Sequence, residues 1–183
     1  MLTPIFIIFL FSENSYGHLI ALSIFIIASI TDAYDGYYAR KYNQVTPEGK
    51  FLDPLADKIL VSSAFISFAL LGIIKFWMVW LIIFRDLFVT GLRMVMEKNG
   101  LSLVTSFVAK FKTSTQMTII IFTLTYLGLK GLSLAWAVPI IEIVKDYELI
   151  YYFTLFVTIF TVFTGLIYVF SNRKIIYQFL REE

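Results

Sequence analysis

Residues 32–57 read DAYDGYYARKYNQVTPEGKFLDPLAD, and they contain four aspartates in two pairs. Asp32 and Asp35 are three residues apart at the end of an apolar run, and Asp53 and Asp57 are four residues apart at the start of the next. On helices, these spacings place both carboxylates of a pair on one face. Carboxylates at membrane depth are costly and indicate a functional site. Four of them facing one another would repel strongly, so we expect cations between them.

The composition is that of an integral membrane protein. The chain has 183 residues, of which 59% are hydrophobic, and its mean hydropathy is +0.82. A soluble domain has less apolar and more charged content, and the apolar residues here come in runs of about membrane-spanning length. We therefore expect a single all-α membrane domain over residues 1–183, with no nucleic-acid partner.

Six apolar segments predict six transmembrane helices. The first is short, and we expect this helix to be truncated at its N-terminus. Residues 130–148 contain Trp136 and Pro139, so we expect them to lie at the membrane interface rather than to span. Pro54 follows Asp53 directly and predicts that the third helix begins near Asp53. The expected spans are 1–11, 18–38, 51–73, 76–96, 111–129 and 149–170.

The placement of lysine and arginine predicts the orientation in the cell (inner) membrane, because cytoplasmic loops are enriched in both. One side of the predicted bundle holds Arg40, Lys41, Lys50, Arg93, Lys98, Lys110, Lys112, Arg173, Lys174 and Arg181, and the other holds Lys75, Lys130 and Lys145. The richer side is predicted to be cytoplasmic. Both aspartate pairs lie on it, so we expect a polar active site that faces the cytoplasm.

The chemistry of the motif points to a metal site with oxygen ligands. The chain has no cysteine and a single histidine, which excludes thiolate-bound and multi-histidine metal sites. Carboxylate ligands favour Mg²⁺, Mn²⁺ or Ca²⁺, and two such ions could clamp a diphosphate. The small residues Gly36, Ala39 and Gly49 would allow a ligand to approach closely. Arg40 adds a positive charge suited to phosphate oxygens.

The pattern Asp-x-x-Asp-Gly-x-x-Ala-Arg, eight residues, Gly-x-x-x-Asp-x-x-x-Asp resembles the signature of the CDP-alcohol phosphotransferases. Every specified position is filled, by Asp32, Asp35, Gly36, Ala39, Arg40, Gly49, Asp53 and Asp57. The resemblance implies a six-helix membrane fold, usually a homodimer, with CMP as the leaving group. It also implies a site for two divalent cations, Mg²⁺ or Mn²⁺.

The resemblance assigns roles to the residues of the motif. The metal ligands would be Asp32, Asp35, Asp53 and Asp57, and Asp57 would also be the catalytic general base. A carboxylate near two cations is a weak base, so the metal would also have to lower the pKa of the hydroxyl. The binding site for the CDP-lipid would be formed by Asp32, Gly36, Ala39, Arg40 and Gly49.

Three further phrases favour one branch of the family. They are LDPLADK at 52–58, RD…VTGLR at 85–93 and KFKT…QM at 110–117. They resemble the members that use glycerol 3-phosphate as acceptor. The implied reaction belongs to phospholipid biosynthesis: a phosphatidyl group passes from CDP-diacylglycerol to the 1-hydroxyl of sn-glycerol 3-phosphate, giving phosphatidylglycerophosphate and CMP.

Glycerol 3-phosphate is an anion, and four cationic residues are candidates for binding it: Arg85, Arg93, Lys110 and Lys112. The positive-inside rule accounts for the last three without any substrate. Arg85 lies deeper in its apolar segment and precedes Asp86, so an internal ion pair is an alternative.

Other functions remain open at the level of sequence. Family members with serine, inositol phosphate or phosphatidylglycerol as acceptor would have the same metal site. An intramembrane prenyltransferase also uses two aspartate-rich motifs, but the Gly-x-x-Ala-Arg continuation and the compact spacing argue against it. A divalent cation transporter could line its path with four carboxylates. Such a path would place acids near the middle of the membrane, whereas these pairs cluster at one face.

Overall fold

The computed structural model describes residues 2–42, 47–100, 107–132 and 134–182. Within the helices, the description leaves out the side chains of residues 33, 35–37, 39–40, 47–57, 107–110, 174, 178 and 180–182. Every regular element in the described residues is helical. This confirms the all-α fold class.

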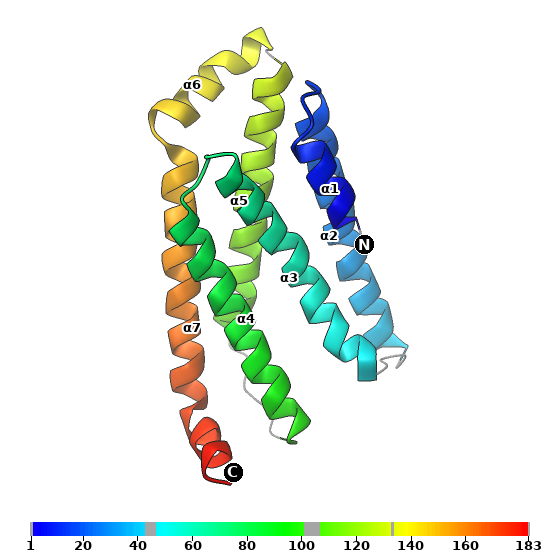
Figure 1. Ribbon diagram of the computed structural model, residues 1–183, viewed down its shortest axis with the longest axis vertical. Helices are drawn as coiled ribbons and strands as arrows, with labels where there is room; N and C mark the ends of the chain where they lie inside the picture. Colours follow the sequence, from blue (N-terminus) through cyan, green and yellow to red (C-terminus); the bar gives the residue numbers. More distant parts are fainter. Residues whose placement is uncertain (1, 43–46, 101–106, 133, 183) are drawn as a thin grey trace.

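The described chain forms a bundle of long helices that run up and down beside one another (Figure 1). A short helix, α6, crosses the end of the bundle between α5 and α7. The elements are α1 (Thr3–Leu10), α2 (Gly17–Lys41), α3 (Pro47–Leu70), α4 (Phe76–Lys98), α5 (Phe107–Leu132), η1 (Ala135–Ala137), α6 (Val138–Asp146) and α7 (Leu149–Glu182).

Proline and glycine mark the ends of several helices. Pro4 and Pro139 lie in the first turns of α1 and α6, where the missing amide hydrogen costs nothing and the fixed φ suits a helix. Gly72 has a φ of 72° in the turn between α3 and α4. This left-handed conformation favours glycine, because it has no Cβ.

The expected start of the third helix is wrong. α3 begins at Pro47 rather than near Asp53. Pro47 itself occupies the favourable first position, so the helix has already formed two turns when it reaches Pro54. Pro54 offers no amide hydrogen to the carbonyl one turn earlier, and the helix continues past it to Leu70. Both residues of the second aspartate pair therefore lie inside a helix rather than at its cap.

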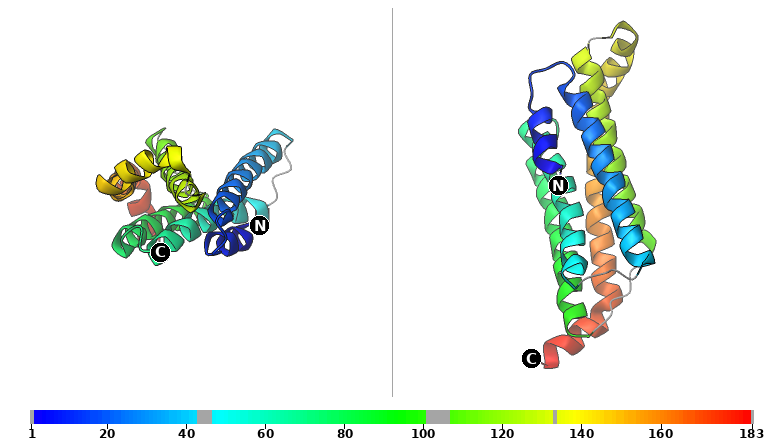
Figure 2. Two further views of the ribbon diagram at one scale, coloured as in Figure 1. Left: turned by 90° about the horizontal axis from the view of Figure 1, so that it is seen from above. Right: turned by 90° about the vertical axis from the view of Figure 1, so that its right-hand side faces the viewer.

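The bundle is apolar on the outside and partly polar on the inside. Buried aromatic side chains include Phe6, Phe25, Phe65 and Phe68, and α1 packs against α2 and α3 while α2 packs along α5 (Figure 2). Buried polar residues include Gln116, Thr123, Thr154, Thr158 and Thr161. Exposed large apolar residues include Ile30, Trp80, Phe84, Phe163 and Phe170. Exposed apolar side chains in this number are typical of a surface that contacts lipid or another protein.

In the described residues, one helix is long and apolar enough to cross a membrane, over Leu149–Arg173 of α7. Gly17–Asp32 and Lys58–Leu70 are shorter apolar helices. α4 has 23 residues, which is long enough to span, but it includes the charged residues Arg85, Asp86 and Arg93. The membrane class thus has support in α7, and the six spans remain a prediction.

Candidate active site

The two aspartate pairs lie at one end of the bundle. The first is in the last three turns of α2 and the second is in the first half of α3. These two helices contact each other, and both segments lie at the lower end of Figure 1. The signature, which is continuous in sequence, is therefore divided between two neighbouring helices.

The side chain of Asp32 is exposed. The side chains of Asp35, Asp53 and Asp57 lie outside the described residues, and so do those of Ala39 and Arg40. Gly36 falls within α2 and Gly49 within the first turn of α3. Among the described residues no group of three or more acidic or histidine side chains could hold a metal. The metal ligands and the CDP-lipid contacts therefore stay predictions.

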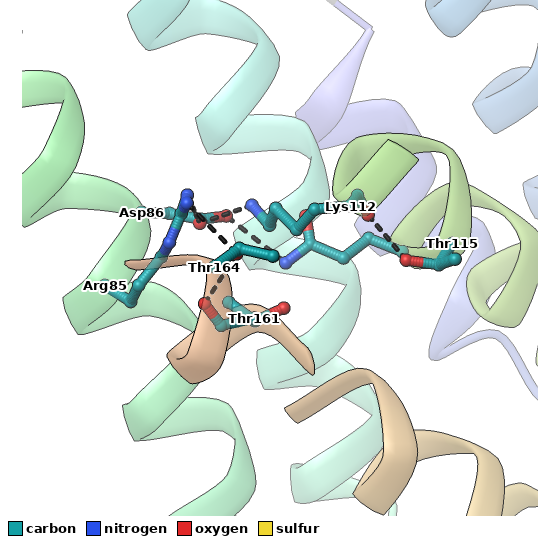
Figure 3. A network of polar contacts seen from close by, with 7 residues as sticks. Arg85, Asp86, Lys112, Thr115, Thr161 and Thr164 are labelled. Carbon is teal, nitrogen blue, oxygen red and sulfur yellow. Dashed lines mark hydrogen bonds and ion pairs between the residues drawn. The ribbon is translucent and has the colours of Figure 1, made fainter. Parts of the chain in front are cut away.

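The described side chains form a buried polar network in the next helices of the bundle (Figure 3). Asp86 of α4 is its centre, and its side chain is 3% exposed. Its Oδ1 accepts a hydrogen bond from the Lys112 ammonium of α5 and one of 3.3 Å from Arg85 Nη1. Its Oδ2 accepts one of 3.3 Å from Gln116 Nε2.

A third helix, α7, completes the network. Arg85 Nη2 donates a 3.2 Å hydrogen bond to Thr164 Oγ1 of α7, and Thr164 in turn donates to the Thr161 carbonyl at 2.8 Å. Gly165 makes this approach possible, since a Cβ there would lie 2.8 Å from Arg85 Cγ. The network thus ties α4, α5 and α7 together through one carboxylate.

The network has an excess of positive charge. Among the described side chains, Arg85 and Lys112 contribute two positive charges to the network and Asp86 contributes one negative charge. The Lys112 side chain is 2% exposed and that of Arg85 12%. Buried charges of this kind are rare unless they are paired or bind a ligand. Lys58, which follows Asp57 in α3, is close enough to act electrostatically on Lys112.

The structure brings together two of the four candidate acceptor-binding residues. Arg85 and Lys112 meet at Asp86, so the ion pair considered for Arg85 is present. Arg93 lies eight residues further along α4, about 12 Å at the helical rise of 1.5 Å per residue. It forms an exposed pair of 3.0 Å with Glu97. The side chain of Lys110 lies outside the described residues.

Sequence reasoning gave no role to Asp86 beyond that pair, and none to Gln116 or Thr164. A signal for Asp86 existed, because an acid within an apolar span is by default functional. Gln116 lies four residues after Lys112, so both occupy the same face of α5. Thr164 had no signal, because its partner Arg85 is 79 residues away in the chain.

Comparison with known proteins identifies the protein family of this chain. Residues 1–146 match the family model described as CDP-alcohol phosphatidyltransferase. This match covers well over half of the chain, which therefore belongs to that family. The family indicated by the eight-position signature is confirmed.

Individual relatives bear more specific names. The chain is 44% identical over 128 residues to the CDP-diacylglycerol–glycerol-3-phosphate 3-phosphatidyltransferase of Bacillus subtilis. The aligned region covers 63% of this chain and 66% of that protein. The chain is 36% identical over 161 residues to the enzyme of the same name in Rickettsia typhi, covering 88% and 86%. A probable phosphatidylglycerophosphate synthase of Mycobacterium tuberculosis is 39% identical over 119 residues, covering 63% and 56%. These names agree with the branch of the family that the three further sequence phrases favoured, in which glycerol 3-phosphate is the acceptor.

Proposed function

We propose that this protein transfers the phosphatidyl group of CDP-diacylglycerol to the 1-hydroxyl of sn-glycerol 3-phosphate, releasing CMP. The observation that carries the proposal is the complete eight-position signature on two contacting helices of a chain from this family. The names of the relatives support the choice of acceptor. The product is phosphatidylglycerophosphate, an intermediate of phospholipid biosynthesis.

Two divalent cations, Mg²⁺ or Mn²⁺, fit the donor set at the ends of α2 and α3. Asp32, Asp35, Asp53 and Asp57 offer carboxylate oxygens, the ligands that these hard ions prefer. When bound, the ions supply charge neutralisation at the diphosphate and polarisation of the reacting oxygens. The small residues Gly36 and Gly49 leave room for the nucleotide beside the carboxylates.

The transfer is a displacement at one phosphorus atom. Asp57 accepts the proton of the acceptor hydroxyl, and that oxygen forms a bond to the phosphorus that bears diacylglycerol. The bond between this phosphorus and the oxygen that joins it to CMP breaks, and CMP leaves with the electron pair. Arg40 lies beside the carboxylates in sequence and is suited to hold a phosphate of the nucleotide.

The buried network is suited to the phosphate of the acceptor. Among the described side chains, Lys112 and Arg85 present two cations to a single carboxylate, and the surplus positive charge would attract an incoming anion. Asp86, which also accepts a hydrogen bond from Gln116, holds the Lys112 ammonium in one position before the substrate binds. Pre-organised donors of this kind need little rearrangement on binding. Arg93 and Lys110 complete the proposed basic pocket at the same end of the bundle.

The proposed enzyme is a multi-pass protein of the cell (inner) membrane with six spans. The aspartate end faces the cytoplasm, where the soluble acceptor is found, because lysine and arginine are concentrated at that end. The enzyme acts as a homodimer, as the family resemblance implies.

The experiment that tests the proposal measures CMP release by the purified protein in detergent. The reaction contains CDP-diacylglycerol, Mg²⁺ and one acceptor at a time: glycerol 3-phosphate, serine, inositol phosphate or phosphatidylglycerol. We expect release that requires both glycerol 3-phosphate and the metal. Release with another acceptor alone would overturn the assigned product, and divalent ion uptake into vesicles without release would favour a transporter.

In the same assay, Asp57→Asn tests the proposed base. We expect turnover to fall about a hundredfold or more, within the range of general-base contributions. Asp146→Asn removes an exposed carboxylate at the other end of the bundle and is the matched control. Full activity of Asp57→Asn, with an unchanged circular dichroism spectrum, would remove Asp57 from this role.

A further inference from the structure

A pocket opens at the end of the bundle opposite to the aspartates. It has a volume of about 710 Å³ and lies between the α3–α4 turn, the end of α5, α6 and the start of α7. Its lining includes Lys75, Lys130, Lys145 and Glu148. Ligand pockets typically measure roughly 300–1,000 Å³, so this one is large enough for a phosphate-bearing group.

The three lysines converge on this pocket from three different elements. Lys75 precedes α4, Lys130 is in the last turn of α5 and Lys145 is in the last turn of α6. In the part of the chain that the structure describes, none of them forms an ion pair, even with Glu148. The four groups together have a net charge of +2, which favours an anion between them.

The position of Lys75 is the most informative of the three. Lysines in the last turn of a helix are favoured by the helix dipole, which accounts for Lys130 and Lys145 individually. Lys75 is instead the N-cap of α4, where a cation is unfavourable, and it makes no side-chain capping hydrogen bond. An anion in the pocket would be attracted by both the ammonium of Lys75 and the positive end of the α4 helix dipole.

The pocket lies at one end of the predicted membrane span of α7. The apolar segment of α7 begins at Leu149, directly after Glu148, so the lysines lie just outside the predicted hydrocarbon layer. Tyr126, Tyr151 and Tyr152 also line the pocket. Tyrosine is enriched at this interface, and its hydroxyl can donate a hydrogen bond to a phosphate oxygen.

We propose that this pocket binds the phosphate headgroup of an anionic phospholipid in the leaflet opposite to the active site, with Lys75, Lys130 and Lys145 as its charged contacts. The acyl chains stay in the membrane along α5 and α7. The proposal concerns binding only and does not depend on the transfer reaction, so its failure would leave the proposed function intact.

The test compares lipid binding by two charge-matched double variants of the full chain. Lys130→Gln with Lys145→Gln removes two charges from the pocket. Lys98→Gln with Arg173→Gln removes two exposed charges at the other end of the bundle. Native mass spectrometry in detergent gives the bound fraction against concentration of dioleoyl phosphatidylglycerol or dioleoyl phosphatidylcholine. Circular dichroism and size-exclusion profiles that match the unmodified protein establish folding.

We expect the unmodified protein and the control variant to prefer phosphatidylglycerol over phosphatidylcholine. The pocket variant should bind phosphatidylglycerol roughly thirtyfold more weakly, because the attraction of two lysines to the anionic lipid is lost. Equal affinity of both double variants, or equal binding of the two lipids, would overturn the proposal. If millimolar inorganic phosphate displaces phosphatidylglycerol and binds the pocket with equal affinity, the site is assigned to free phosphate and the lipid assignment is overturned.

Discussion

At the scale of single residues, Asp86 is the point at which three helices meet. Its carboxylate neutralises one of two buried cations, Lys112 and Arg85, and orients Gln116. A buried ion pair contributes little net stability, because desolvation opposes the attraction, but the loss of one partner leaves an uncompensated charge. The network should therefore matter most for the position of the Lys112 ammonium.

Substitution of Asp86 separates the contribution of the network to stability from its effect on the position of the Lys112 ammonium. We expect Asp86→Ala to lower the free energy of unfolding by about 3–5 kcal/mol, since two buried cations lose their counter-charge. Asp86→Leu with Lys112→Met replaces the ion pair by apolar groups and should recover much of this loss. Thermal unfolding in detergent, followed by the fluorescence of Trp77 and Trp80 on α4, measures the change.

Both variants should fail to release CMP with glycerol 3-phosphate, because the Lys112 ammonium is displaced in one and absent in the other. A stable double variant with an unchanged KM for glycerol 3-phosphate would contradict the role proposed for Lys112. If Asp86→Ala is as stable as the unmodified protein, the network does not hold the buried cations in the way described.

At the scale of elements, glycine sets how closely two pairs of helices approach. A Cβ at Gly128 of α5 would overlap the Leu19 side chain of α2, whose Cγ would be 3.0 Å away. On α7, Gly165 lies against Arg85 of α4. Small residues at such contacts let helices pack closely in a membrane. Leu19 and Arg85 fill the space that a larger residue would occupy.

Replacement of Gly128 tests the contact between α2 and α5. We expect Gly128→Val to destabilise the protein by about 1–3 kcal/mol, the usual cost of overpacking. Gly91→Val on α4 is the matched control, because its Cβ would meet no atom within 4 Å. Thermal unfolding in detergent compares the two, and equal melting temperatures would show that α2 and α5 can separate at no cost.

At the scale of the whole molecule, the two ends of the bundle differ in chemistry. One end holds the aspartate pairs, and the other holds the pocket with three lysines. The proposed orientation places the first end in the cytoplasm. The distance between the ends, along helices of 23 or more residues, is sufficient to cross a bilayer.

Single cysteines test this orientation directly, because the chain has none of its own. We expect Asp146→Cys to react with a membrane-impermeant maleimide in intact spheroplasts. Lys98→Cys should react only after the membrane is permeabilised. Both positions are exposed, so the reverse pattern would place the aspartate end outside the cytoplasm.

The sequence alone determined the helical class, the aspartate signature and the family, because each depends on local spacing or composition. Apolar runs bounded by proline and glycine located most helices to within a few residues. The predicted start of α3 was wrong because Pro54 resembles the first residue of a helix, whereas the helix begins at Pro47. Local pattern cannot decide between two prolines that both fit the first turn.

Only the tertiary structure decided which cations are neighbours. Lys112 reaches Asp86, the neighbour of Arg85, across 26 residues of chain, and Thr164 joins Arg85 from α7. Arg93, equally plausible by sequence, pairs instead with Glu97 at the surface. The three lysines of the opposite pocket are likewise far apart in sequence and meet because α6 crosses the end of the bundle. Helix packing sets these distances, and no periodicity within one segment encodes them.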